Sequence, residues 1–323
     1  MKYSKSDAKD YAREHMKGLW AANLTPFTPD LAFDEAGFRR NLRHWIDDLG
    51  LGGVFIAGKQ AEFFSLSLGE RTRLLETAVD EAAGACGVMM SCSDENLDTV
   101  LGLARHAEAA GADYIIVHSP PLYFHKSVDA VLYEYYRHIC EQVEIGVAIW
   151  HQPDYGYVMG PEVCARIAEL PNVVAIKYSV PRELYAELTR IAGDKLLVST
   201  SAEDQWLENI VELGWQVYLC STPPFLMQTE HDRRMQEYTD LALRGDVAAA
   251  RRVRDSLEPV RAALRDTRPA DKPQAHQKYW QELLGQAGGP VRRPLLNLTQ
   301  AEKAATRTAF QACGLKLRAE SAA

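Results

Sequence analysis

The sequence lacks the features that would place it outside the cell or in a membrane. Its 323 residues contain no C-x-x-C pair, and the charged N-terminus has no apolar signal-peptide core. No run approaches the ~20 apolar residues that a membrane span needs. The cysteines are spread along the chain and are expected to be buried free thiols, as is usual for cysteine in a reducing compartment. We therefore expect a cytoplasmic protein.

Clusters of basic residues are also absent. The net charge is -8, and charges of both signs are scattered along the chain, so no basic surface is expected to bind nucleic acid or anionic lipid. No G-x-G-x-x-G loop follows a strand-like run, which argues against a dinucleotide site. A hydrophobic content of 47% allows a large core, either one α/β barrel or two domains. The expected partner is a small molecule.

Short apolar runs alternate with amphipathic segments from residue 18 to about 225, which is typical of repeated βα units. Helical spacing appears between the runs, as in 34–49 and in 96–110, where Gly111 is a natural helix end. Eight units predict a (β/α)8 TIM barrel, whose chemistry lies at the C-terminal ends of the strands. The predicted strands are 19–24, 54–57, 88–92, 114–118, 147–150, 173–177, 196–200 and 217–221.

Strand-like runs stop after Pro223-Pro224. The remaining pattern predicts helices broken at Gly245, at 268–273 and at 288–290. We therefore expect a barrel with a short N-terminal segment over 1–230 and a C-terminal helical extension packed on it over 231–323.

The sixth predicted strand ends in a lysine, in the run N-V-V-A-I-K at 172–177. Desolvation at a barrel mouth favours the neutral form of Lys177 and can lower its pKa by up to ~3–5 units. A neutral amine can attack a ketone, and the resulting iminium draws electrons during C–C cleavage, C–C formation or loss of water. The alternative from the residues alone is a lysine paired with a neighbouring carboxylate.

Two further segments stand out beside the V-x-x-x-K run that ends at Lys177: G-L-W-A-A-N-L-T-P-F at 18–27 and G-L-G-G-V-F-I-A-G-K-Q-A-E-F-F-S-L-S at 50–67. Together these three segments resemble the dihydrodipicolinate synthase and N-acetylneuraminate lyase superfamily. The resemblance extends from Gly18 to about Gly314. It implies a lyase, an aldolase or dehydratase, that forms a Schiff base through Lys177 with a 2-oxo acid such as a pyruvate-derived compound. It also implies no cofactor or metal, and a homodimer or homotetramer.

The match weakens where relatives bind the substrate carboxylate with G-T-T-G-E or G-T-x-G-E. Here 58–62 reads G-K-Q-A-E, which puts Lys59 and Gln60 near the carboxylate. Lys59 can pair with that carboxylate or lower the pKa of Lys177 by repulsion. A solvated loop lysine is the third possibility.

Relatives carry a proton-relay tyrosine in Y-N-x-P, where this chain has W-H-Q-P with Trp150 in the tyrosine position. An indole donates but does not shuttle protons. His151 and Tyr178 are the candidate replacements. Strand alternation points His151 away from the side of Trp150, so a structural role stays open. Trp150 itself is expected to shape the pocket.

Two further residues take positions that the family uses, and a third lies at a strand end. Tyr123, in P-P-L-Y, corresponds to a tyrosine that reaches across a subunit interface into the neighbouring site; packing at that contact is the alternative. Tyr155 stands where relatives that bind a distal carboxylate often carry arginine, which argues against the aspartate-semialdehyde substrate of lysine biosynthesis. Ser221 ends the last strand and is expected at the substrate.

Two subgroups share local features with the chain. E-F-F-S-L at 62–66 resembles 5-dehydro-4-deoxyglucarate dehydratases, which implies a polar sugar-acid pocket. The K-Y after the sixth strand and K-Y-W…R-R-P-L-L-N-L at 278–298 resemble arylidene-pyruvate hydratase-aldolases, which implies an aromatic pocket. The aromatic residues favour the second alternative, although several can be core residues. They are Trp20, Phe63, Phe64, Trp150, Tyr155 and Tyr157.

Two other functions stay open on the sequence alone. Potential metal ligands fall near strand ends at Glu62, Asp94, His118 and His151, but they form no compact motif, so no metal site is predicted. A catalytically altered barrel could instead act as a ligand-binding or regulatory protein. Retention of Lys177 argues against that alternative, because an unneeded desolvated ammonium is costly.

Overall fold

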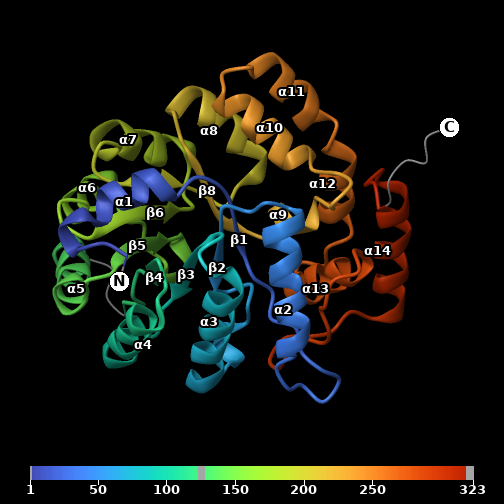
Figure 1. The fold of residues 1–323 in the computed structure, drawn as a ribbon, viewed down its shortest axis with the longest axis horizontal. Helices are drawn as coiled ribbons and strands as arrows, with labels where there is room; N and C mark the ends of the chain where they lie inside the picture. Colours follow the sequence, from blue (N-terminus) through green and yellow to red (C-terminus); the bar gives the residue numbers. More distant parts are fainter. Residues whose placement is uncertain (1, 123–127, 318–323) are drawn as a thin grey trace.

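The computed structural model describes residues 2–122 and 128–317, and its eight parallel strands form a nearly closed barrel surrounded by helices (Figure 1). The (β/α)8 TIM barrel predicted from the sequence is confirmed. Two predicted strands, β4 and β8, have the predicted bounds, and the others differ by one or two residues at one or both ends. The strands are β1 Gly18–Ala22, β2 Gly53–Ile56, β3 Gly87–Ser91, β4 Tyr114–His118, β5 Gly146–His151, β6 Val173–Tyr178, β7 Leu197–Ser199 and β8 Val217–Ser221.

A serine side chain joins the two strands at which the sheet begins and ends. The strand order is β7-β6-β5-β4-β3-β2-β1-β8, so β7 and β8 meet without a hydrogen-bonded ladder. The Ser199 hydroxyl donates to the carbonyl of Val217 at 2.9 Å and accepts from the Leu219 N–H at 2.9 Å. This hydroxyl therefore bridges the seam of the barrel just where β7 ends.

Trp20 fills the N-terminal end of the barrel. A Cβ atom added at Gly53 or Gly87 would lie 2.3 Å from its indole ring, so glycine is required there at the first positions of β2 and β3. Helix α1, Ala8–His15, packs against β5 and β6, and Tyr11 lies near Tyr114 below the indole. The interpretation of Trp20 as a pocket residue is therefore wrong, because it lies at the end of the barrel opposite to Lys177.

The helices that surround the barrel begin and end close to their predicted positions. Asp34 caps the second helix by accepting from the Gly37 N–H at 2.8 Å, and the segment His44–Asp48 continues that helix as a π-helical turn. Gly111 ends α4 in the left-handed conformation, as predicted. The helices are α2 Glu35–Arg43, α3 Leu68–Ala82, α4 Leu97–Ala110, α5 Asp129–Gln142, α6 Pro161–Ile167, α7 Arg182–Ala192 and α8 Trp206–Leu213. Short 3-10 helices cover Lys5–Asp7, Phe63–Ser65, Pro153–Tyr155 and Glu203–Gln205.

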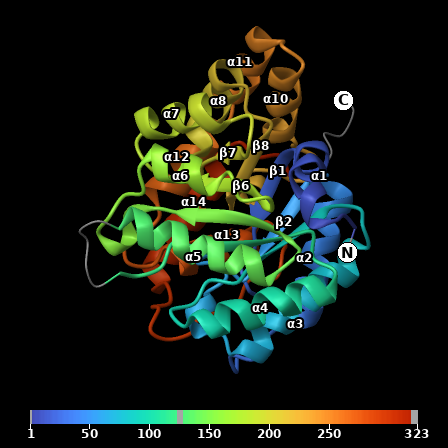
Figure 2. The same ribbon diagram turned by 90° about the vertical axis from the view of Figure 1, so that its left-hand side faces the viewer.

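The remaining helices come after β8 in the chain, and Figure 2 shows the molecule from a second side. Breaks occur at the three predicted places, between α10 and α11, between α12 and α13, and between α13 and α14. Helix α10 packs on α8 and β1, where the helix after β8 belongs in a TIM barrel. None of the described helices is long and apolar enough to cross a membrane. These helices are α9 Pro223–Leu226, α10 Arg234–Leu243, α11 Val247–Asp255, α12 Glu258–Asp266, α13 Pro273–Leu283 and α14 Gln300–Ala312.

Candidate active site

Four side chains form a row across the barrel at the C-terminal ends of neighbouring strands. His118 pairs in register with Trp150, Trp150 with Lys177, and Lys177 with Ser199. Residues in register on adjacent strands point to the same face. The Lys177 Nζ lies 4.9 Å from the Trp150 ring centre and 5.5 Å from that of Phe55, inside the barrel. The row therefore forms one layer of the barrel interior around the lysine.

Lys177 is buried, with 1% of its surface exposed. Its Nζ donates to the carbonyl of Cys220 at 2.6 Å, and among the described residues no carboxylate lies within ion-pair distance of it. Burial lowers the pKa of Lys177 to about 8, because a charged ammonium is poorly solvated there. A useful fraction of this amine is therefore neutral near pH 7.

Lys59 lies at the mouth of the barrel, on the loop after β2. Its ammonium forms an ion pair with Asp154 and sits 5.3 Å from the Trp150 ring centre. Burial, together with repulsion from the charge of Lys177, lowers the pKa of Lys59 to about 8. Next to it, Gln60 has a buried Oε1 atom without a hydrogen-bond partner in the described chain. Both predicted carboxylate-binding residues thus lie on one loop, and Lys59 already contacts a carboxylate.

The C-terminal extension fastens this loop to the barrel. Glu62 has a φ of 60° and is fully buried, and its carboxylate accepts from Lys278 Nζ at 3.1 Å and from the Arg292 N–H at 2.9 Å. Burial raises the pKa of Glu62 and lowers that of Lys278 to about 8. The guanidinium of Arg292 also binds Glu70 at 2.6 and 3.0 Å. The motif at 278–298 therefore contributes a clamp on the loop that carries Lys59.

The structure does not bring His151 to Lys177. Its ring lies on the opposite face of β5, where Nδ1 is 2.8 Å from the Ser119 hydroxyl and Nε2 accepts from the Met159 N–H at 3.1 Å. Burial lowers the pKa of His151 to about 3. The hydroxyl of Tyr178, the other candidate relay, donates to the carbonyl of Met159 on that same outer face. Both side chains therefore bind the segment before α6, through Met159, and neither faces the barrel interior.

His118 is the imidazole that the structure does place at the mouth. Its place at the end of a predicted strand indicates the barrel mouth, and the only chemical role that the sequence suggests for it is that of a metal ligand; it is the last residue of β4. Its Nδ1 lies 2.8 Å from the carbonyl of Ser119, which leaves Nε2 facing Asp154 at 3.6 Å. Burial, opposed by the hydrogen bond to Ser119, lowers the pKa of His118 to about 4, so the ring is neutral near pH 7.

Two clefts open beside this layer. The first, which we call the aromatic cleft, has a volume of about 400 Å³. Tyr155 lies in it with its ring edge-on to His118, at 5.1 Å between ring centres. Tyr157 is not part of it, since its hydroxyl donates to the carbonyl of Pro120 beside His151. The cleft is lined by Phe63, Phe64, Ser93, Asp94, Glu95, His118, Ser119, Pro121 and Tyr155.

The second cleft, which we call the arginine cleft, has a volume of about 360 Å³ and contains Ser221. The predicted interface residue Tyr123 lies outside the described residues. The potential metal ligands are dispersed, since Glu62 binds Lys278 and Asp94 binds Arg71. Within the described ranges, no three His, Cys, Asp or Glu residues are grouped to hold one metal ion.

Comparisons with known proteins agree with this fold. The sequence profile of the Dihydrodipicolinate synthetase family matches residues 15–313. The 4-hydroxy-tetrahydrodipicolinate synthase of Methylobacterium radiotolerans is 28% identical over 301 residues, covering 93% of this chain and 96% of the relative. The protein of Bradyrhizobium sp. (strain ORS 278) named Probable 5-dehydro-4-deoxyglucarate dehydratase is 28% identical over 326 aligned residues, covering 99% of each chain.

Solved structures show the same fold. A crystal structure of dihydrodipicolinate synthase from Aquifex aeolicus superposes with a TM-score of 0.81 at 23% identity, covering 93% of this chain and 98% of the other. A prophage protein of the dihydrodipicolinic acid synthase family from E. coli K12, in complex with pyruvate, gives a TM-score of 0.82 at 22% identity, covering 93% and 99%. With the family profile spanning nearly the whole chain and a buried lysine closing its sixth strand, this protein belongs to the dihydrodipicolinate synthetase family.

Proposed function

We propose that this protein is a lyase that forms a Schiff base between Lys177 and the ketone of a 2-oxo acid. The observation that carries the proposal is the desolvated amine of Lys177 inside the barrel, with a pKa lowered to about 8 and a carbonyl rather than a carboxylate as partner. The neutral nitrogen attacks C2 of the 2-oxo acid, and loss of water gives an iminium. The iminium is the electron sink for the next step, so the mechanism requires no cofactor.

Lys59 and Gln60 are proposed to hold the carboxylate of the 2-oxo acid. A substrate carboxylate would take the place of Asp154 at the Lys59 ammonium, and the side-chain N–H of Gln60 on the same loop would donate to it. Trp150 packs between the two lysines and keeps water away from the amine. Ser221 and Tyr155 are proposed to contact the rest of the substrate, one in each cleft.

His118 is proposed to move the protons that the missing tyrosine moves in relatives. It lies in register with Trp150, and its Nε2 faces the mouth. A neutral imidazole with a free nitrogen can accept a proton from a substrate carbon or hydroxyl and return it. The outer-face positions of His151 and Tyr178 do not support the same role for them.

Loss of water from a sugar acid is the second candidate reaction, beside aldol cleavage. The relative named as a dehydratase aligns over 99% of both chains, and the loop run 62–66 that resembles such enzymes is the segment clamped by the extension. Both reactions use the same iminium, and they differ in whether a C–C or a C–O bond breaks.

We further propose that the protein is a cytoplasmic homo-oligomer, a dimer or tetramer, in which Tyr123 enters the site of a neighbouring subunit. Mixed oligomers test whether Tyr123 acts in the neighbouring subunit. Lys177→Ala protein and Tyr123→Phe protein should each be less active than the original protein. An oligomer assembled from both variants should regain activity, because some of its sites combine an intact Lys177 with an intact Tyr123 from the neighbouring subunit. Size measurement by light scattering gives the oligomeric state itself, and a monomer would contradict this part of the proposal.

Trapping with borohydride tests the central step. The protein is incubated with pyruvate, reduced and mapped by mass spectrometry, and the adduct is expected on Lys177. Lys177→Met protein should give none, while Lys59→Met protein, the matched control, should still be labelled on Lys177. An adduct on Lys59 would overturn the assignment. Absence of an adduct with every 2-oxo acid tested would favour a ligand-binding or regulatory barrel.

A further inference from the structure

A single hydroxyl takes the place of a backbone ladder at the seam between β7 and β8. In a parallel ladder, one residue donates its N–H to a carbonyl of the neighbouring strand, and its own carbonyl accepts an N–H from further along that strand. The Ser199 hydroxyl does both, because it donates to the carbonyl of Val217 and accepts from the Leu219 N–H, each at 2.9 Å. It therefore fixes the position of β8 along β7 at this level of the barrel.

The same hydroxyl lies beside the proposed nucleophile. Ser199 is the register partner of Lys177 in the ladder between β6 and β7. On β8, Leu219 is followed by Cys220, whose carbonyl accepts from Lys177 Nζ at 2.6 Å. The N–H that Ser199 holds and the carbonyl that meets the amine thus belong to adjacent residues. A shift of β8 at the seam would therefore move this carbonyl away from Lys177.

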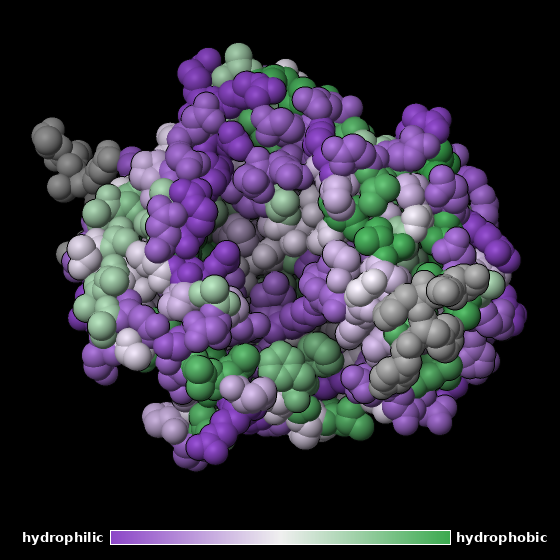
Figure 3. Space-filling view, turned by 180° about the vertical axis from the view of Figure 1, so that it is seen from behind, coloured by the Kyte–Doolittle hydropathy of each residue, from purple (hydrophilic) through white to green (hydrophobic). Residues whose placement is uncertain are grey.

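The seam is closed to solvent at this level. Ser199, Leu219 and Cys220 are fully buried, whereas the hollowed face of the molecule in Figure 3 is bordered mainly by hydrophilic residues. Buried backbone N–H and carbonyl groups are almost always paired, because an unpaired one is destabilising. Loss of the Ser199 hydroxyl would leave one group of each kind unpaired on β8, so this strand would be expected to move in search of new partners.

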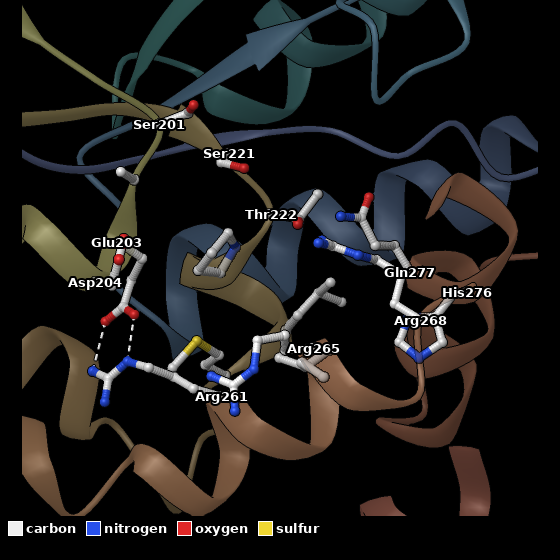
Figure 4. Close-up of a pocket in the computed structure, with 15 residues that line it drawn as sticks. Ser201, Glu203, Asp204, Ser221, Thr222, Arg261, Arg265, Arg268, His276 and Gln277 are labelled. Carbon is white, nitrogen blue, oxygen red and sulfur yellow. Dashed lines mark hydrogen bonds and ion pairs between the residues drawn. The ribbon is translucent and has the colours of Figure 1, made fainter. Parts of the chain in front are cut away.

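A second side chain crosses the seam closer to the barrel mouth. The Tyr218 hydroxyl donates to the carbonyl of Ser201 at 2.8 Å. Figure 4 shows Ser201, just beyond β7, and Ser221, the last residue of β8, on the same side of the arginine cleft. The bond from Tyr218 joins the two segments through a long side chain. It therefore ties the seam without holding the backbone next to Cys220.

We propose that Ser199 is a positioning residue for Schiff-base formation, because its hydroxyl holds β8 where the Cys220 carbonyl meets the nitrogen of Lys177. This inference rests on the proposed Schiff base. The amine, the ketone and one proton from solvent combine and lose water, and the iminium nitrogen keeps one hydrogen and carries the positive charge. The Cys220 carbonyl is placed to accept that hydrogen. A hydrogen bond to a charged group favours its charged form, so the carbonyl supports both the ammonium and the iminium.

Ser199→Ala tests the inference through trapping on Lys177. A displaced carbonyl no longer supports the ammonium, so the midpoint of the pH–rate curve with subsaturating pyruvate should fall by about one unit. Above that midpoint the amine is neutral in both proteins, and the half-saturating concentration of pyruvate should rise about tenfold, because the iminium loses the same acceptor. Ser199→Cys has a side chain of similar size with weaker hydrogen bonding. It should give intermediate shifts, and it serves as the test if Ser199→Ala protein does not fold.

Tyr218→Phe is the matched control, since it removes the other cross-seam hydrogen bond and leaves both bonds of Ser199 in place. It should keep the original midpoint and half-saturating concentration, whatever its free energy of unfolding in urea. Ser199 variants that lose stability but keep both trapping values would overturn the inference, and so would a Tyr218→Phe protein that changes them as strongly. Failure of the original protein to trap any 2-oxo acid would instead defeat the proposed function.

Discussion

Lys59 is ion-paired with Asp154 directly over the indole of Trp150, the side chain that also packs on Lys177. The pair links the loop after β2 to the short helix after β5, and it occupies the position proposed for the substrate carboxylate. The two partners are partly exposed, with 29% and 35% of their side-chain surface accessible. At the proposed site, an incoming carboxylate would therefore compete with Asp154 for the same ammonium.

Replacing Asp154 should strengthen binding of the 2-oxo acid. Because exposed ion pairs contribute about 0.2–1 kcal/mol, Asp154→Asn is expected to lower the half-saturating concentration of pyruvate by up to about fivefold. The measurement is the concentration dependence of borohydride trapping on Lys177. In contrast, Lys59→Met should raise that concentration. An Asp154→Asn protein that binds pyruvate more weakly would show that Asp154 assists rather than competes.

The rate of Schiff-base formation should follow the titration of Lys177. The neutral amine reacts, so with subsaturating pyruvate the rate should rise about tenfold per pH unit below the pKa of about 8 and level off above it. An unshifted lysine would instead keep gaining rate up to a pKa near ~10.4. Trapping rates measured between about pH 6 and 10 distinguish the two curves.

His118 should be needed for proton transfer after the Schiff base has formed. His118→Gln is expected to slow the exchange of the methyl protons of pyruvate with deuterium by about 100-fold, within the range for a general base, while trapping on Lys177 persists. Exchange is followed by NMR, which needs no knowledge of the natural substrate. His151→Gln is the matched control and should keep the exchange rate. If His151→Gln slowed the exchange and His118→Gln did not, His151 rather than His118 would be the proton relay.

Removing Lys278 should destabilise the protein and loosen the loop that carries Lys59. Lys278→Met leaves the Glu62 carboxylate buried without its partner, which is expected to cost about 3–5 kcal/mol of unfolding free energy. The double variant Lys278→Met with Glu62→Gln should recover part of that loss, because no uncompensated charge stays buried. Urea unfolding measures the free energy of unfolding of the single and the double variant. Equal stability of the single variant and the original protein would contradict the clamp.

The sequence predicted the barrel well because each strand is a local apolar run, and it placed Lys177 because the lysine interrupts such a run at its end. Strand alternation also indicated that His151 points away from Trp150. The end position of His118 on β4 could be predicted, but its pairing with Trp150 follows from the register between β4 and β5, which no local pattern reports. The partners of Lys59 and Glu62 come from segments far along the chain, so these ion pairs could not be predicted. The division at residue 230 stays a proposal, with α10 packed on β1 just beyond it.

The clamp on Glu62 has a consequence for how this protein is made. Its ammonium partner comes 216 positions later, and the backbone N–H of Arg292 comes 230 positions later. A nascent chain can complete all eight strands while the loop that carries Lys59 and Gln60 still lacks its anchor. Synthesis must pass Arg292 before that loop can be held in the shape described above, so a product terminated earlier would be a barrel in which this loop is not fixed.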